Sequence, residues 1–306
     1  MTQETSEPNN IFDMSKIKAN IEKKLGKNEV IEQSSQISEQ KIQHTTENLK
    51  KDKKAKKYVL TGISGFDELF ENGIPTGSNI LVAGGAGSGK TIFCLQTLQY
   101  HVSRGEKCFY MSFEESEKRL MEHMEDFGWN PEKLLASDNL KIKRYLPSDI
   151  HYLSEKGSND AMFAKEEDSQ LLQLEPITLE EGYKPDFVII DSLTAIASTF
   201  MGKEGSYRFY AERLFRFFEK IGSTNYFITE TRQMPETFSQ TGVEEFLADG
   251  VIVLYNIKRE STRQRAIEVL KMRGTKHKEK IVAMKISDNG MIVYPKQEVF
   301  GGMETK

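Results

Sequence analysis

One segment of the chain has the residue types and spacing that can hold the phosphates of a nucleotide: Gly84-Gly85-Ala86-Gly87-Ser88-Gly89-Lys90-Thr91. It fits the pattern G-x-x-x-x-G-K-T, in which the backbone N–H groups of a glycine-rich loop surround the phosphates. The ammonium group of Lys90 can reach the β- and γ-phosphates, and the hydroxyl of Thr91 can bind Mg²⁺. The segment lies between a predicted strand at 79–83 and a predicted helix at 92–100, which is the context that this loop requires.

Carboxylates at two other places could complete the chemistry of phosphoryl transfer. Phe187-Val188-Ile189-Ile190-Asp191 is a buried-strand pattern that ends in an acid. Asp191 would therefore lie at the carboxyl end of a strand, where it can hold Mg²⁺ together with Thr91. Glu114 and Glu115 follow another predicted strand and could activate a water for attack on the γ-phosphorus. Paired glutamates are also common at helix starts, because they favour the helix dipole.

A basic segment ends one of the last predicted strands: Lys271-Met272-Arg273-Gly274-Thr275-Lys276-His277. Lys271 and Arg273 alternate along the strand, so their side chains lie on the same face. Phosphoryl transfer needs positive charge on the γ-phosphate, and a neighbouring subunit often supplies it. Taken alone, a basic strand end is more often simply solvated.

The elements that would position these residues alternate between strands and helices. This order predicts an α/β fold, a mostly parallel central sheet with helices on both faces. The strands are expected at 79–83, 107–113, 140–145, 187–191 and 225–229, and the helices at 92–100, 116–127 and 207–221. Four late strands, at 251–255, 266–272, 282–287 and 291–294, are joined by short turns such as 288–290. They predict a C-terminal antiparallel meander.

Composition divides the 306-residue chain into a tail, 1–56, and a domain, 57–306. The tail is polar and rich in lysine, so we expect it to be disordered. One part of it, 11–25, has apolar residues at helical spacing and could be a short amphipathic helix that docks a protein partner. Residues 148–184 form a polar, acidic insertion, either a partly ordered lid or a disordered loop.

The overall charge and the cysteines limit the classes of function. A formal net charge of −4 does not favour nucleic-acid binding, which usually makes a domain strongly basic. No apolar run has the length of a membrane span, and the first residues lack the apolar core of a signal peptide. The two cysteines, Cys94 and Cys108, are expected to be reduced thiols in the core of a cytoplasmic protein.

These motifs together resemble those of the KaiC-like branch of the RecA-type ATPases. The resemblance covers roughly residues 58–296, and its motifs recur in order over the whole domain. Besides the phosphate loop, it is carried by Thr61-Gly62-Ile63, Gly65-Phe66-Asp67-Glu68-Leu69, Gly73-Ile74-Pro75-Thr76-Gly77-Ser78, Ser112-Phe113-Glu114-Glu115, Phe127-Gly128-Trp129, Gly242-Val243-Glu244-Glu245-Phe246-Leu247-Ala248-Asp249-Gly250-Val251 and Leu270-Lys271-Met272-Arg273-Gly274-Thr275.

The resemblance implies a RecA-like P-loop ATPase that binds ATP and Mg²⁺ and assembles into a homo-oligomeric ring, a hexamer in the family, with ATP between subunits. It implies nucleotide contacts from Gly85, Ala86, Gly87, Ser88, Gly89, Lys90, Thr91 and Ile92, and from Lys271, Met272, Arg273, Thr275 and His277 of the adjacent subunit. Thr91 and Asp191 would hold the metal. The catalytic residues would be Glu114 and Glu115, with Lys271 and Arg273 acting on the neighbour's ATP.

The chain departs from the family pattern at several points. It has one such domain, whereas the cyanobacterial clock members have two. Glu245 and Phe246 stand where the clock kinase domain has its phosphorylated Ser-Thr pair, so the resemblance implies an ATPase rather than an autokinase. Asp126 replaces a small polar residue that lies near the nucleotide base.

Two other classes of function stay open beside a regulatory or signalling ATPase. One is a RecA-like DNA recombination or repair paralogue, for which only the tail lysines argue. The other is a non-hydrolysing, nucleotide-gated assembly protein, against which the retained Glu114 and Glu115 argue.

Overall fold

The computed structural model describes residues 58–146, 179, 182–202, 204–232, 235, 237–239, 241–259 and 261–299. All of them belong to the unit that spans Lys57–Lys306. The tail 1–56, with its expected helix at 11–25, lies outside the described residues. So does most of the acidic insertion at 148–184.

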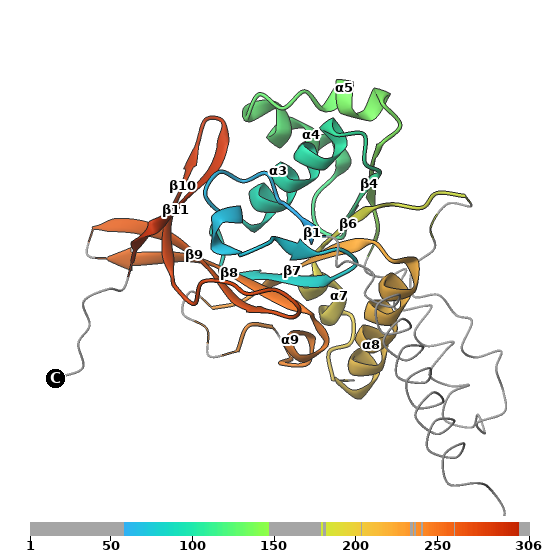
Figure 1. Ribbon diagram of the computed structural model, residues 1–306. Coiled ribbons are helices and arrows are strands. Elements are labelled where there is room, and N and C mark those ends of the chain that lie inside the picture. The colour runs from blue at the N-terminus through green and yellow to red at the C-terminus, as the bar shows by residue number, and fades with distance from the viewer. Residues whose placement is uncertain are drawn as a thin grey trace, which may run out of the picture. The chain divides into compact units, whose positions relative to one another are not determined.

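The described strands form one nine-stranded sheet in the order β11-β10-β9-β8-β3-β7-β6-β4-β5 (Figure 1). From β8 to β5 in this order, neighbouring strands are parallel. The consecutive strands β8 to β11 are antiparallel, which confirms the expected meander. The bounds are β3 (Asn79–Gly84), β4 (Cys108–Ser112), β5 (Leu140–Arg144), β6 (Phe187–Asp191), β7 (Thr224–Glu230), β8 (Gly250–Arg259), β9 (Thr262–Met272), β10 (Val282–Ser287) and β11 (Gly290–Glu298).

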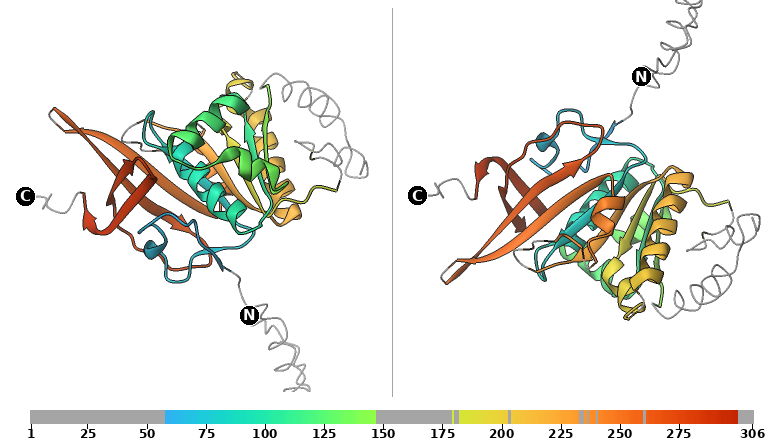
Figure 2. Two further views of the ribbon diagram at one scale, coloured as in Figure 1. Left: turned by 90° about the horizontal axis from the view of Figure 1, so that it is seen from above. Right: turned by 90° about the horizontal axis from the view of Figure 1, so that it is seen from below.

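Helices cover both faces of the sheet, as expected for an α/β fold of this type (Figures 1 and 2). One face carries α3 (Lys90–Ser103), α4 (Glu117–Asp126) and α5 (Pro131–Ala136), and the other carries α7 (Leu193–Ser198), α8 (Glu204–Ile221) and α9 (Glu244–Leu247). The central strand β3 serves both layers: Ile80 and Val82 pack under α3, whereas Leu81 packs under α8. An uninterrupted apolar strand is therefore needed at this position.

The register of the parallel strands brings their carboxyl ends together at one edge of the sheet. Ser112 at the end of β4 pairs with Asp191 at the end of β6, and Gly84 at the end of β3 pairs with Glu230 at the end of β7. Ligands of open α/β sheets bind at this edge. The phosphate loop and the predicted acids thus meet there.

The β8–β9 hairpin is longer than the apolar pattern of its sequence predicts. The pairing runs out to Arg259 and Thr262, beyond the expected strands 251–255 and 266–272. The added residues include Lys258, Arg263 and Arg265, so they lack the apolar alternation that marks a half-buried strand.

Smaller elements complete the described part of the chain. A two-stranded sheet, β1 (Tyr58–Val59) with β2 (Ile74–Pro75), flanks the short helix η1 (Asp67–Leu69). Among the helices that the structure describes, none has the length and apolar character to cross a membrane.

Candidate nucleotide-binding site

The phosphate loop connects β3 to α3 and encloses the side chain of Lys90. Gly87 and Gly89 have φ angles of 69° and 105°, a left-handed conformation that favours glycine. The Lys90 ammonium donates to the carbonyl oxygens of Gly84 and Gly85 at 2.9 and 3.2 Å. Burial lowers the pKa of Lys90, although the Glu230 carboxylate, 4.0 Å away, raises it. A desolvated cation beside the amino end of a helix is well suited to bind a phosphate.

Two side chains of the β8–β9 hairpin hold the phosphate loop by hydrogen bonds. Asn256 on β8 donates through Nδ2 to the Gly87 carbonyl at 3.3 Å, and Arg265 on β9 donates through Nε to the same oxygen at 3.3 Å. At Gly84, an added Cβ would lie 2.4 Å from the Leu254 carbonyl oxygen, so only glycine fits there. These contacts fix the shape of the loop.

Thr91 and Asp191 lie together, as the sequence predicts for a magnesium site. The Thr91 hydroxyl donates to Asp191 Oδ2 at 3.4 Å, and the phenol of Tyr110 donates to the same oxygen at 2.5 Å. Burial raises the pKa of Asp191 to about 6, and the charges of Glu114 and Glu115 raise it as well. A buried carboxylate and a hydroxyl are the hard oxygen donors that Mg²⁺ prefers, so the residues present fit this ion.

Glu114 and Glu115 lie next to this pair but have different neighbours. Ser112, at the end of β4, accepts from the Glu115 N–H at 3.0 Å and so fixes the turn that presents both acids. The Ser192 hydroxyl donates to the Glu114 carboxylate. Glu115 Oε2 instead lies 3.6 Å from Nε of Arg119 and 3.6 Å from Nδ1 of His123, both on α4.

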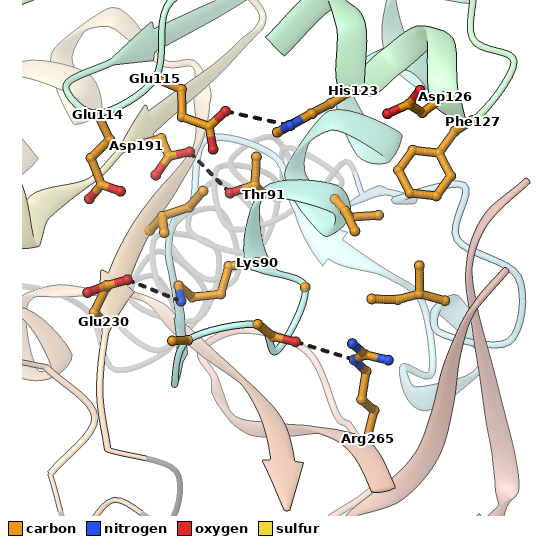
Figure 3. Close-up of a pocket in the computed structure, with 16 residues that line it drawn as sticks. Lys90, Thr91, Glu114, Glu115, His123, Asp126, Phe127, Asp191, Glu230 and Arg265 are labelled. Atoms are coloured by element: carbon orange, nitrogen blue, oxygen red, sulfur yellow. Dashed lines mark hydrogen bonds and ion pairs between the residues drawn. The ribbon is translucent and has the colours of Figure 1, made fainter. Parts of the chain in front are cut away.

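One cavity of about 510 Å³ collects these groups, a size typical of a small-molecule site (Figure 3). Of the residues expected at the site, it is lined by Ala86, Gly87, Gly89, Lys90, Thr91, Ile92, Glu114, Glu115, Asp126 and Asp191. Phe127, from the motif Phe127-Gly128-Trp129, lines it as well. The sequence did not single out the other lining residues, which are His123, Ile228, Glu230, Arg265 and Ile286. Two further loop residues do not line the cavity: Gly85 contacts Lys90 through its carbonyl, and Ser88 is fully buried.

The basic strand end of the same chain lies outside this cavity. The Lys271 ammonium donates to the carbonyl oxygens of Ala248 and Glu245 at 2.7 and 3.1 Å. Arg273 pairs with Asp249 Oδ1 at 3.4 Å and donates to the Phe246 carbonyl at 3.3 Å. Both cations therefore lie at the end of α9. Their expected contact with a neighbour's ATP stays a prediction.

The other residues of this segment differ in exposure. The Met272 side chain is buried against Gly250, where an added Cβ would lie 2.3 Å from Met272 Cε. A contact from Met272 to a nucleotide would therefore come from its backbone. Thr275 and His277 follow the strand, and His277 forms a bridge with Phe70 that anchors this segment to η1.

The raised pKa of Asp191 predicts a pH-dependent cost to stability in the nucleotide-free protein. Because the pKa of Asp191 is raised in the folded state, the folded protein binds the carboxyl proton more tightly than the unfolded chain does. The stabilisation of the folded state by this proton is fully present below pH 3.8 and is lost as the pH rises through about 6. The two pKa values differ by about 2 units, and at about 1.4 kcal/mol per unit the loss in free energy of unfolding is roughly 3 kcal/mol. We expect Asp191→Asn to unfold at higher urea concentration than the parent at pH 7, with a smaller difference at pH 5. A difference independent of pH would contradict this expectation.

Comparisons with known proteins agree with this geometry. A family model described as "ATPase: KaiC" matches residues 59–298. The circadian clock oscillator protein KaiC of Prochlorococcus marinus subsp. pastoris is 33% identical over 254 residues, 80% of this chain and 48% of the relative. The circadian clock protein KaiC3 of a Synechocystis strain is 34% identical over 242 residues, 77% of this chain and 45% of the relative.

A solved structure extends the match to three dimensions. The crystal structure of a KaiC-like protein from the archaeon Pyrococcus horikoshii aligns with a TM-score of 0.62 and 29% identity, covering 78% of this chain and all of the other. The chain spans less than half the length of the clock relatives. The family model nevertheless matches most of the described domain, residues 59–298, and this chain belongs to the KaiC family of RecA-type ATPases.

Proposed function

We propose that this protein is a Mg²⁺-dependent ATPase that works as a ring of identical subunits in the cytoplasm and serves as a regulatory or signalling switch. The observation that carries the proposal is the single cavity into which the phosphate loop, Asp191 and the two glutamates all open. A cation for phosphates, oxygen ligands for a metal and carboxylates for a water are the groups that ATP hydrolysis requires.

In this proposal each group of the cavity has a defined role. Lys90 and the amino end of α3 bind and orient the β- and γ-phosphates. Glu114 or Glu115 takes the proton from the attacking water. Mg²⁺, held near Thr91 and Asp191, would neutralise charge on the phosphates. The half-exposed Glu230 contacts Lys90 at the open end of the loop and would be displaced by a phosphate.

Two observations at the basic strand end support assembly through that surface. Phe246, whose carbonyl accepts from Arg273, is 77% exposed, and Leu270, which precedes Lys271 along β9, is 40% exposed. Apolar side chains exposed next to cations are typical of a contact surface. Lys271 and Arg273 lie outside their own cavity, and beside their contacts at the end of α9 they would also serve a neighbouring subunit's ATP.

The direct test measures mass in solution and phosphate release together. The proposal expects a monomer or small oligomer without nucleotide, a larger closed oligomer with Mg-ATP, and slow release of phosphate. Release of phosphate by a protein that stays monomeric at every concentration would contradict the ring. Assembly without any release would favour a nucleotide-gated assembly protein instead.

Replacing Arg273 by alanine should lower hydrolysis and ATP-dependent assembly together, because one group would serve both. Mixing Arg273→Ala subunits with Lys90→Ala subunits should restore part of the activity, since some interfaces then join an intact loop to an intact arginine. Lys276→Ala is the matched control, because Lys276 is exposed on the same segment and pairs only loosely with Glu71, at 3.9 Å. If mixed rings that demonstrably exchange subunits show no recovery, Arg273 does not act on a neighbour.

A further inference from the structure

Tyr110 is a buried phenol whose hydroxyl points at the metal-site carboxylate. It lies in the middle of β4, is fully buried, and donates to Asp191 Oδ2 at 2.5 Å. The Thr91 hydroxyl donates to the same oxygen at 3.4 Å. One oxygen of the carboxylate is thus held by two hydroxyl groups that come from different elements.

The sheet register explains why Tyr110 reaches Asp191. Ser112 is the direct neighbour of Asp191 across the β4–β6 pair, and Tyr110 lies two residues before Ser112. Tyr110 and Asp191 are therefore diagonal neighbours on the same face of the sheet, within reach of a long aromatic side chain. The Tyr110 side chain is fully buried in the hydrophobic core that α3 forms with this face of the sheet, which restricts the rotation of the ring.

Without such a donor, a carboxylate can rotate about its terminal bond, and ordering it on metal binding costs free energy. A donor on a rigid ring removes that freedom in advance. Outer partners that orient a metal-binding carboxylate in this way commonly change metal affinity by ten- to a hundredfold when they are removed.

We propose that Tyr110 is a positioning residue for the metal site, which holds the Asp191 carboxylate in the orientation that binds the Mg²⁺ of the nucleotide complex. The inference rests on the proposed function, because it assumes that Mg²⁺ binds near Thr91 and Asp191. It adds that the affinity for the metal, rather than for the nucleotide itself, depends on a phenol in the core of the sheet.

Tyr110→Phe tests this, because it removes the hydroxyl and keeps the ring. The affinity for ADP is measured once with Mg²⁺ and once with EDTA. The affinity with Mg²⁺ divided by the affinity with EDTA reports how much the bound metal contributes to binding. We expect the ratio to fall about tenfold in Tyr110→Phe, while the affinity in EDTA stays within about twofold of the parent. Tyr226→Phe is the matched control: Tyr226 is equally buried, on β7, and its hydroxyl has no hydrogen-bond partner among the described residues. Its ratio should equal that of the parent.

The outcomes separate this inference from the proposed function. A parent protein whose ADP affinity does not respond to Mg²⁺ would contradict the metal site itself. A normal response in the parent and an equal one in Tyr110→Phe would overturn only the role of Tyr110. If Tyr110→Phe does not fold, the substitution is made in the Asp191→Asn background and compared with Asp191→Asn alone. A further fall in the ratio there would also overturn the inference, because Tyr110 would then act without Asp191.

Discussion

Replacing Lys90 by alanine should lower the affinity for ATP by at least about a hundredfold. Hydrogen bonds to charged groups contribute about 1.5–3 kcal/mol each, and this ammonium can bond two phosphates at once. It already lies inside the loop, bonded to the Gly84 and Gly85 carbonyls and shielded from water. On binding, phosphate oxygens would replace some of these partners, so the ammonium is already held close to the place where it acts. Titration with a fluorescent ATP analogue measures the loss.

Two controls make the Lys90 result interpretable. Lys118→Ala removes an exposed lysine that pairs with Glu122 on α4, away from the loop, and should bind ATP like the parent. Circular dichroism should show a folded Lys90→Ala variant. Burying the charge of Lys90 costs free energy of folding, and the substitution removes that cost. Equal ATP affinity in a folded Lys90→Ala variant would refute nucleotide binding at this loop.

Changing Glu114 and Glu115 to glutamine together should slow hydrolysis by about a hundredfold or more, the scale of losing a general base. Binding should stay close to normal, because neither carboxylate is expected to contact the phosphates favourably. Phosphate release under saturating ATP measures the rate. A double variant that hydrolyses ATP at the parent rate would show that the two acids serve only the start of α4.

The single variants divide the effect between the two acids, which have different neighbours. Glu115 lies near Arg119 and His123, whereas Glu114 accepts from Ser192, the residue after Asp191. Glu122→Gln is the control, because it removes an exposed carboxylate from α4, the helix that follows the two acids. The acid whose substitution alone reproduces the double variant is the one that activates the water.

The order of elements and the parallel sheet could be predicted because each central strand is an apolar run closed by a turn. The phosphate loop needed no tertiary information, since its pattern is contiguous. The short helices α5 and α7 were missed, because six residues are too few to show a helical period. The ends of β8 and β9 were missed for another reason: backbone pairing, rather than burial, holds their charged residues in place.

The site was predicted where it depends on local motifs and missed where it depends on sheet order. Tyr110 and Arg265 are far from Asp191 and Gly87 in sequence, and only the register of β4 with β6 and the return of β9 bring them together. The helix expected at 116–127 includes His123 and Phe127, yet an expected helix does not say which of its residues border a cavity; in the structure His123 lies on α4 and Phe127 directly follows it.

In the ring that we propose, Arg265 on β9 and Arg273, the residue after β9, would serve two different nucleotide sites. Arg265 contacts the phosphate loop of its own subunit, and Arg273 follows eight positions later along the chain. At about 3.3 Å per residue in a strand, the two are about 26 Å apart. In the ring that we propose, a dissociated subunit would thus lack part of its catalytic charge. The rate per subunit would fall on dilution, and total rate plotted against protein concentration would curve upward instead of following a straight line.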